Sequence, residues 1–142
     1  MHSIKLKGQT AIEYLLVVSI IVALMVVILL NGGNYVQETI SLSASRNFLL
    51  NYTARNPSLA FTTLAFNLSG SNFTIYPHIY LNGIIVNSSN DASDVMNVGY
   101  GMLNAINLAI TSQELNPSAV ISLNKKGDCS TIGHYYYCVM FQ

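Results

Sequence analysis

An uninterrupted apolar run near the N-terminus constrains this chain more than any other feature. Residues 14–30 read YLLVVSIIVALMVVILL and contain no charged side chain and a single serine, Ser19. As a helix, these seventeen residues rise about 26 Å, which is at the short end of what crosses a bilayer. A helix that is apolar on all sides suits lipid or a bundle of similar helices. The run therefore predicts a helix that lies in a membrane or in an assembly.

The charges around this run predict its orientation. His2, Lys5 and Lys7 precede it, and the next basic residue is Arg46. The positive-inside rule then leaves the N-terminus in the cytoplasm and exports the residues after 31. A secretory signal has a shorter apolar core of roughly 7–15 residues and a small-x-small cleavage site after it. The residues after Leu30 offer no such site, so we expect the segment to be retained.

The residues just before the run form a second pattern. Residues 5–15 read KLKGQTAIEYL, with two lysines, a Gly8-Gln9 pair and one acid, Glu13, four residues after Gln9. This constellation resembles the class III signal peptide of archaeal type IV pilin-like proteins. The family pattern often has Ser at the position of Ala11.

The resemblance implies how the chain is processed and where it goes. A prepilin peptidase would cleave between Gly8 and Gln9 on the cytoplasmic side, so that the apolar segment is retained. The expected parts are a leader over residues 1–8, a hydrophobic stalk helix over 9–56 and an exported β-rich head over 57–142. The implied partners are identical subunits in a homopolymer, an assembly ATPase and a membrane platform. The protein would lie in the cytoplasmic membrane first and in an extracellular surface filament afterwards.

Glu13 has a physical role that fits this resemblance. Positions 9 and 13 lie on one face of a helix, one turn apart. After cleavage, the new amine at Gln9 and the Glu13 carboxylate would form a charge pair, within a subunit or between neighbours, in surroundings where opposite charges attract strongly. The alternative is that Glu13 lies near the lipid headgroups, where a charge costs little. The whole constellation favours the assembly charge pair, Gln9 and Glu13.

Helical spacing continues beyond the apolar run. The apolar positions that carry it are Tyr35, Val36, Ile40, Leu42, Phe48, Leu49 and Tyr52. Pro57 predicts the end of this helix, because the residue before a proline is disfavoured in the α region. The pair Gly32-Gly33 lowers helix propensity by about 1 kcal/mol per glycine and predicts a kink or a melted turn.

The remainder of the chain has strand character. Residues 61–70, 72–87 and 119–141 are rich in β-branched and aromatic side chains. Turn residues separate them at Gly70, at Asn82-Gly83 and at 126–128. We therefore expect an α+β fold, in which the long hydrophobic helix is followed by a small, mostly antiparallel β-rich domain. Residues 91–113 fit a helix or an alternating strand, and we favour the helix.

Four Asn-x-Ser/Thr sequons are candidate N-glycosylation sites in an exported protein. They begin at Asn51, Asn67, Asn72 and Asn87. A chain rich in Asn, Ser and Thr produces several such triplets by chance, so occupancy is open at each.

Two cysteines, Cys129 and Cys138, flank a turn expected at Gly133. A hairpin there would bring them together, and export favours a disulfide over free thiols. Closing a loop of about ten residues would stabilise the fold by about 2–3 kcal/mol. A zinc site is not predicted, because only His134 lies nearby.

Composition limits the classes of function. Six basic and six acidic residues among 142 offer no polybasic surface, so nucleic acid is not an expected partner. The exported acids form no recognisable catalytic pair, no catalytic or phosphate-binding motif occurs, and we expect neither a cofactor nor a metal. These acids are Asp91, Asp94, Glu114 and Asp128. In the triplet 135–137, tyrosines that alternate along a strand favour core packing over an adhesive patch.

The sequence thus predicts a structural subunit of an archaeal type IV pilus-like filament, with adhesion as its favoured role, and not an enzyme. The alternative is an unprocessed, single-pass, membrane-anchored extracellular binding module. An anchored enzyme would need a site whose groups converge from distant positions.

Overall fold

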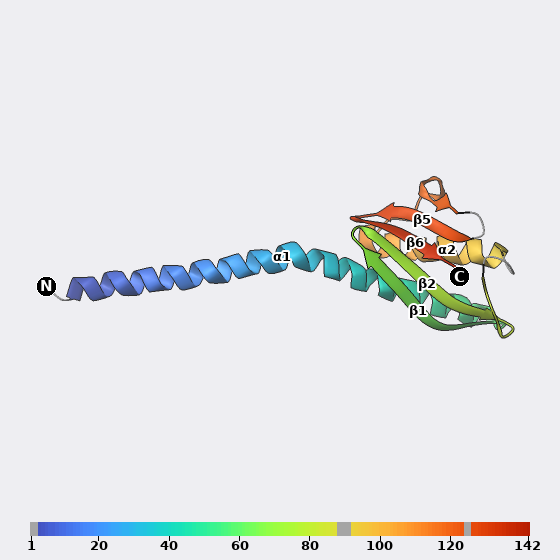
Figure 1. Ribbon diagram of the computed structural model, residues 1–142, viewed down its shortest axis with the longest axis horizontal. Coiled ribbons are helices and arrows are strands. Elements are labelled where there is room, and N and C mark those ends of the chain that lie inside the picture. The colour runs from blue at the N-terminus through green and yellow to red at the C-terminus, as the bar shows by residue number, and fades with distance from the viewer. Residues whose placement is uncertain (1–2, 88–91, 124–125) are drawn as a thin grey trace. The chain divides into compact units, whose positions relative to one another are not determined.

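The computed structural model describes residues 3–87, 92–123 and 126–142, without the side chains of residues 3–10, 31 and 92–96 (Figure 1). The elements in chain order are α1 (Ser3–Arg55), β1 (Leu59–Ser69), β2 (Asn72–Leu81), β3 (Ile84–Ile85), α2 (Ala92–Thr111), the short 3-10 helix η1 (Pro117–Ala119), β4 (Ile121–Ser122), β5 (Gly127–Ile132) and β6 (Tyr135–Met140). The chain divides into two compact units, residues 1–36 and 37–142. The expected α+β fold, with a long apolar N-terminal helix before a sheet domain, is confirmed.

Helix α1 continues from the first unit into the second and ends before Pro57, as predicted. Its last turn is closed by the Asn56 side chain, whose Nδ2 donates to the Tyr52 carbonyl oxygen at 2.8 Å. The helix is not melted at Gly32 and Gly33. Glycine keeps its backbone donor and acceptor, so the hydrogen-bond ladder continues there at a cost of about 1 kcal/mol per residue.

The second unit is built on one six-stranded sheet in the order β1-β2-β6-β5-β4, with β3 beside β2. Four of its strand pairs are antiparallel, and β2 pairs with β6 in parallel. Most of the strand pairs are therefore antiparallel, as predicted, and the parallel β2–β6 pair makes the sheet mixed. The parallel pair arises because the chain leaves the sheet after β3, passes through α2, and returns so that β6 enters next to β2.

Turns lie at Gly70, Asn82-Gly83 and Gly133, as predicted, whereas Gly127 and Asp128 of the turn predicted over 126–128 belong to β5. Asn82 and Gly83 join β2 to β3 with positive φ values of 51° and 84°, the backbone form that an Asn-Gly hairpin turn requires. Gly70 and Gly133 occupy the β1–β2 and β5–β6 turns. At Gly127, which begins β5, a Cβ would collide with the Val139 carbonyl oxygen of the adjacent strand.

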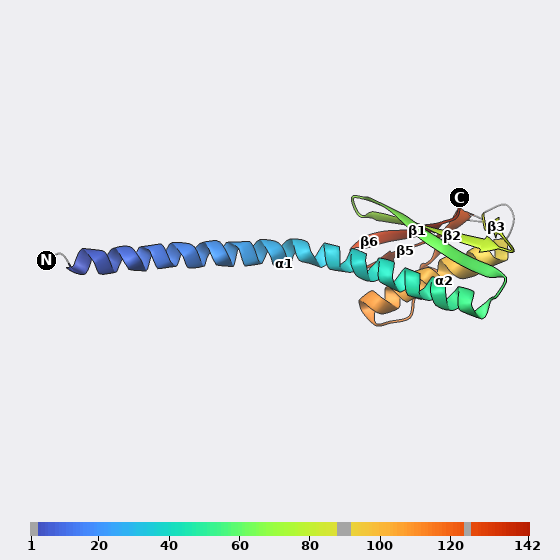
Figure 2. The ribbon, with the colours of Figure 1, turned by 90° about the horizontal axis from the view of Figure 1, so that it is seen from below.

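Helices cover one face of the sheet. Figure 2 shows α2 and the second half of α1 together on the same side of the strands. Alternate residues of β2 and β6 point into this layer and form the core with both helices. Its fully buried members include Leu49, Phe73, Ile75, Ile79, Met102, Leu103, Ile106, Tyr137 and Val139. Figure 1 looks onto the opposite face, which no described segment covers.

Helix α2 confirms the favoured interpretation of residues 91–113. Its two internal glycines make room for neighbours: a Cβ on Gly101 would overlap the Phe48 ring of α1, and one on Gly99 would lie 2.6 Å from Asp128 Oδ2. Glycine at these two positions lowers the helix propensity of α2 but allows α2 to pack closely on α1 and β5.

Candidate functional site

The first candidate site is the apolar part of α1. Every side chain of residues 11–30 is exposed, and the large apolar ones range from 38% exposed at Val18 to 78% at Leu29. The described residues contain one helix long and apolar enough to cross a membrane, and it includes this segment. So much exposed apolar surface is stable only against lipid or another chain, because water disfavours it.

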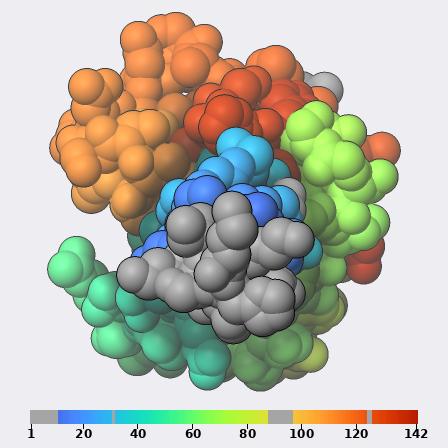
Figure 3. Space-filling view, turned by 90° about the vertical axis from the view of Figure 1, so that its left-hand side faces the viewer, coloured from blue at the N-terminus to red at the C-terminus, as the bar shows by residue number. Residues whose placement is uncertain are grey.

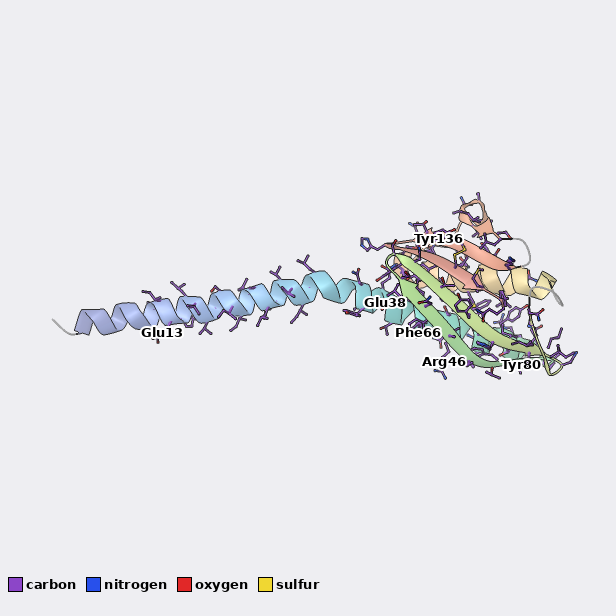
Figure 4. All side chains as sticks on the ribbon, in the orientation of Figure 1. Glu13, Glu38, Arg46, Phe66, Tyr80 and Tyr136 are labelled. Carbon is purple, nitrogen blue, oxygen red and sulfur yellow. A yellow bond between two sulfur atoms is a disulfide. The ribbon has the colours of Figure 1, made fainter. Side chains whose placement is uncertain are left out.

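Glu13 is the only charged residue among residues 11–30. It is exposed, on the N-terminal part of α1 (Figure 4). The predicted cleavage residues, Gly8 and Gln9, lie within the helical backbone of α1. The Gln9 side chain lies outside the described set, and the cleavage site and the Gln9–Glu13 pair stay predictions.

A closed set of hydrogen bonds fastens the beginning of the second unit to the β5–β6 hairpin. Gln37 Nε2 donates to the Ile132 carbonyl at 3.1 Å and to Tyr137 Oη at 3.4 Å. Ser41 Oγ donates to the Gln37 carbonyl at 2.6 Å and lies 2.6 Å from Tyr137 Oη. Since the Ser41 hydroxyl has one hydrogen, Tyr137 donates to Ser41. We call these three side chains, Gln37, Ser41 and Tyr137, the polar anchor.

The polar anchor is buried. Burial raises the pKa of the Tyr137 hydroxyl, while the hydrogen bond that it accepts from Gln37 acts in the opposite direction. Gly133 completes the site, because a Cβ there would lie 2.7 Å from Gln37 Nε2. Nearby, Tyr135 Oη donates to Glu38 Oε1 at 3.0 Å. These contacts hold helix and hairpin in one relative position.

Sequence reasoning missed this anchor. The predicted apolar stripe has its first members, Tyr35, Val36 and Ile40, on the exposed surface. The buried row is instead Gln37, Ser41, Ser45 and Leu49, spaced one helical turn apart. The polar residues Gln37, Ser41 and Ser45, spaced four apart, are the local sequence signal for this buried row. Their partners lie almost a hundred residues further along the chain.

Two grooves lie beside the second half of α1. One, of about 460 Å³, runs between α1 and α2 and is lined by apolar and small residues that include Phe48, Ala105 and Leu108, with Arg55 among them. The other, of about 470 Å³, lies between α1 and β1 and is lined in part by Arg46 and Phe66 (Figure 4). Phe66 is 52% exposed, although its ring stacks on Phe73.

The second candidate site is the uncovered face of the sheet, which we call the outer sheet face. Its half-buried members on β2 and β6 are Thr74, Tyr76, His78, Tyr80, Tyr136, Cys138 and Met140. None of these side chains is an acid, a lysine or an arginine, and three are tyrosines. Tyr135 and Tyr137 point the other way and are buried, which confirms the predicted division of the tyrosine triplet.

The disulfide predicted from the sequence is present. Cys129 and Cys138 pair directly across β5 and β6, with 4.1 Å between their Cα atoms, and form the bond. It closes the hairpin whose turn carries Gly133, on the outer sheet face.

The predicted glycosylation residues lie in different settings. Asn51 is exposed on α1, Asn67 is exposed on β1, and Asn72 is the exposed first residue of β2. Asn87 is half-buried after β3 and makes an interaction of its own. Its sequon continues into residues outside the described set.

The acids that follow residue 57 do not gather into a site among the described residues. Asp128 is buried and accepts hydrogen bonds from the Tyr100 backbone N–H and the Ser122 hydroxyl. Burial raises the pKa of its carboxyl group, against the effect of those bonds. Glu114 is exposed, and Asp91 and the Asp94 side chain are not described. Within the part of the chain that the structure describes, no three His, Cys, Asp or Glu side chains are placed to hold a metal ion.

These features define a class of protein in which a membrane-compatible N-terminal helix is followed by a disulfide-bonded α+β unit. Comparisons with protein-family models, with curated proteins and with solved structures find no match for this chain.

Proposed function

We propose that this protein is a structural subunit of an archaeal type IV pilus-like surface filament. A prepilin peptidase cleaves it between Gly8 and Gln9, and it polymerises through α1, with the second unit displayed outward. The observation that carries the proposal is the exposure of every side chain of residues 11–30, a segment that follows a basic leader and a Gly8-Gln9 pair and contains one acid, Glu13.

Energetics explain why such a subunit needs an assembly machine. Burial of a Leu, Ile or Val side chain contributes about 1.5–3 kcal/mol relative to water. Lipid is already apolar, so transfer of α1 from a membrane to a helix bundle gains only packing and paired charge. An assembly ATPase and a membrane platform would supply the remaining work.

The surface of the second unit supports assembly as well. The grooves beside residues 37–55 give α1 flanks lined by apolar and small side chains. The basic residues at these grooves are Arg55 and Arg46.

Processing is tested by the N-terminal sequence of the protein isolated from its native cells. We expect Gln9 as the first residue. A terminus at Met1 or His2 would contradict cleavage and would favour the unprocessed anchor.

Assembly is tested by Glu13→Gln and Glu13→Ala, with Ser19→Ala as the matched control on the same exposed helix. Loss of one member of a desolvated charge pair costs about 3–5 kcal/mol, so sheared filaments should fall at least about tenfold. Both variants should still insert in the membrane, as measured by fractionation. Normal filament yield from both would remove Glu13 from the mechanism.

The alternative is a single-pass, membrane-anchored binding module, and the outer sheet face is the observation in its favour. That face presents Tyr76, Tyr80 and Tyr136 without a covering segment among the described residues. Retention of residues 1–8 together with ligand-dependent protection of these tyrosines from iodination would support it. A filament subunit would lack the leader.

A further inference from the structure

The turn between β1 and β2 carries two sequons that interlock across the strands. Residues 67–69 form one and residues 72–74 the other, with only Gly70 and Ser71 between them. The antiparallel register pairs Asn67 with Thr74 and Ser69 with Asn72. Each sequon's asparagine therefore lies opposite the hydroxyl residue of the other.

We propose that Asn67 and Asn72 are N-glycan attachment sites and that Asn51, although it has a sequon and is exposed, is not. The proposal rests on the export half of the proposed function and does not need polymerisation. The modification adds a carbohydrate shell to the outer sheet face and leaves the grooves beside α1 clear.

Exposure and position support the two strand sites. Asn67, Ser69 and Asn72 are exposed, and Thr74 is half-exposed, all on the outer sheet face. Figure 3 shows the light-green turn at the surface. β1 is the edge of the sheet, so a transferase approaches it from the side as well as from the face. An N-glycan is bulky and needs such a surface position.

A neighbouring ring gives Asn72 a further feature. The parallel register places Asn72 beside Tyr136 of β6, and Tyr136 is half-exposed on the same face (Figure 4). The apolar face of a first sugar on Asn72 can pack on this ring, since tyrosine offers an apolar body with a polar tip. The remaining outer face, with its uncharged side chains, then has a hydrated cover.

Asn51 differs in conformation and in surroundings. It lies within α1, and the hydroxyl of its sequon is engaged: Thr53 Oγ1 donates to the Leu49 carbonyl oxygen at 2.9 Å. Asn51 also lines the α1–α2 groove with Phe48 and Leu108. A glycan there would fill the groove. Acceptor sequons are expected in surface loops of secreted proteins, and Asn51 lies within a helix, whereas Asn67 and Asn72 flank the β1–β2 turn.

The reaction is glycosyl transfer from a lipid-linked oligosaccharide. The Asn amide Nδ2 forms a bond to C1 of the first sugar, while the bond from that C1 to the phosphate oxygen of the lipid carrier breaks. The nitrogen loses one proton, and the lipid phosphate leaves with the bonding electron pair and accepts a proton. No atom is oxidised or reduced.

Mass spectrometry of peptides from the native protein tests the site assignment. Trypsin releases residues 47–55, which contain Asn51, and chymotrypsin, which cuts after Phe66 and Phe73, releases residues 67–73, in which fragmentation assigns glycan to Asn67 or Asn72. We expect glycan mass on Asn67 and Asn72 and the bare mass for 47–55. Glycan on Asn51, or its absence from both strand sites, would overturn the proposal.

Substitutions in the sequons and at two tyrosines of the outer sheet face test the assignment site by site. Asn67→Gln and Asn72→Gln should each remove one step of electrophoretic mobility shift, and Asn51→Gln none. Thr74→Ala should abolish glycan on Asn72 only. Tyr136→Ala should lower occupancy at Asn72 at least about twofold, while Tyr80→Ala, on the same face, should not; equal occupancy in both would exclude the ring's role.

Export is read separately, by protease digestion of intact cells. A protein that stays protected contradicts both this inference and the filament. An accessible protein with a Met1 terminus and glycans on Asn67 and Asn72 contradicts the filament alone. An accessible, correctly processed protein without those glycans contradicts this inference alone.

Discussion

Two parts of the same helix, α1, differ in what surrounds them. Residues 11–30 expose every side chain, whereas residues 37–55 bury Leu49 completely and contribute Gln37 and Ser41 to the polar anchor. The exposed part is the more apolar of the two, which reverses the usual relation between hydropathy and burial in a soluble protein.

The difference shows that helix formation and tertiary packing are separate requirements here. An apolar helix gains backbone hydrogen bonds by itself, but its side chains gain free energy only when something covers them. Residues 37–55 find that cover in the sheet of their own unit. Residues 11–30 must find it in lipid or in other chains, because no described segment of their own chain covers them.

The largest expected difference in stability is between two Leu→Ala variants, one with the substitution in each part of α1. Leu49→Ala should lower the free energy of unfolding of the detergent-dissolved subunit by about 2–5 kcal/mol, because it leaves a cavity in the core. Leu24→Ala, at a side chain that is 57% exposed, should change it by less than about 0.5 kcal/mol. Denaturant titration checks both values. Equal losses would show that the two parts are packed alike.

Reduction of the disulfide should cause the next largest loss of stability. Opening the loop between Cys129 and Cys138 should lower the stability of the second unit by about 2–3 kcal/mol and its melting temperature accordingly. Membrane association of residues 11–30 should be unchanged, which sharpens the contrast between the parts. An unchanged melting temperature after confirmed reduction, or free thiols in native material, would contradict the structural role of the bond.

Tyr137→Phe tests the polar anchor. Removal of the hydroxyl takes away the donor to Ser41 and the acceptor for Gln37, so we expect a loss of about 1–2 kcal/mol. Tyr136→Phe, one residue earlier and on the outer sheet face, is the control and should cost less than about 0.5 kcal/mol. Calorimetry compares the two, and similar losses would mean that the anchor contributes nothing special.

The smallest expected effect is a pH dependence of the folding stability of the second unit. The pKa of Asp128 is raised in the folded state by burial, so the folded state binds this proton more tightly than the unfolded state does. Wild type should therefore gain stability relative to Asp128→Asn as pH falls from 7 through the raised pKa, and lose it as pH rises. Melting temperatures across this range measure the difference; Glu114→Gln, at an exposed carboxylate, should show no such trend.

Local patterns predicted much of the fold. Asn82-Gly83 predicted its turn because few other pairs adopt two successive positive φ values, and Gly133 between two cysteines predicted the disulfide-closed hairpin. The Gln37–Ser41–Tyr137 anchor could not be predicted in this way. Whether a buried serine is tolerated depends on a partner that the fold brings from a distant position.

By itself, the sequence determined that residues 14–30 form an apolar helix and that the cysteines close a hairpin. Each of these depends on neighbours along the chain. Only the tertiary structure decided that Gln37 and Ser41 are buried while Tyr35 and Val36 are exposed, that β6 runs parallel to β2, and that Gly99 and Gly101 admit Asp128 and Phe48. These features depend on complementary shapes and hydrogen-bonding groups from distant segments, which no local pattern contains.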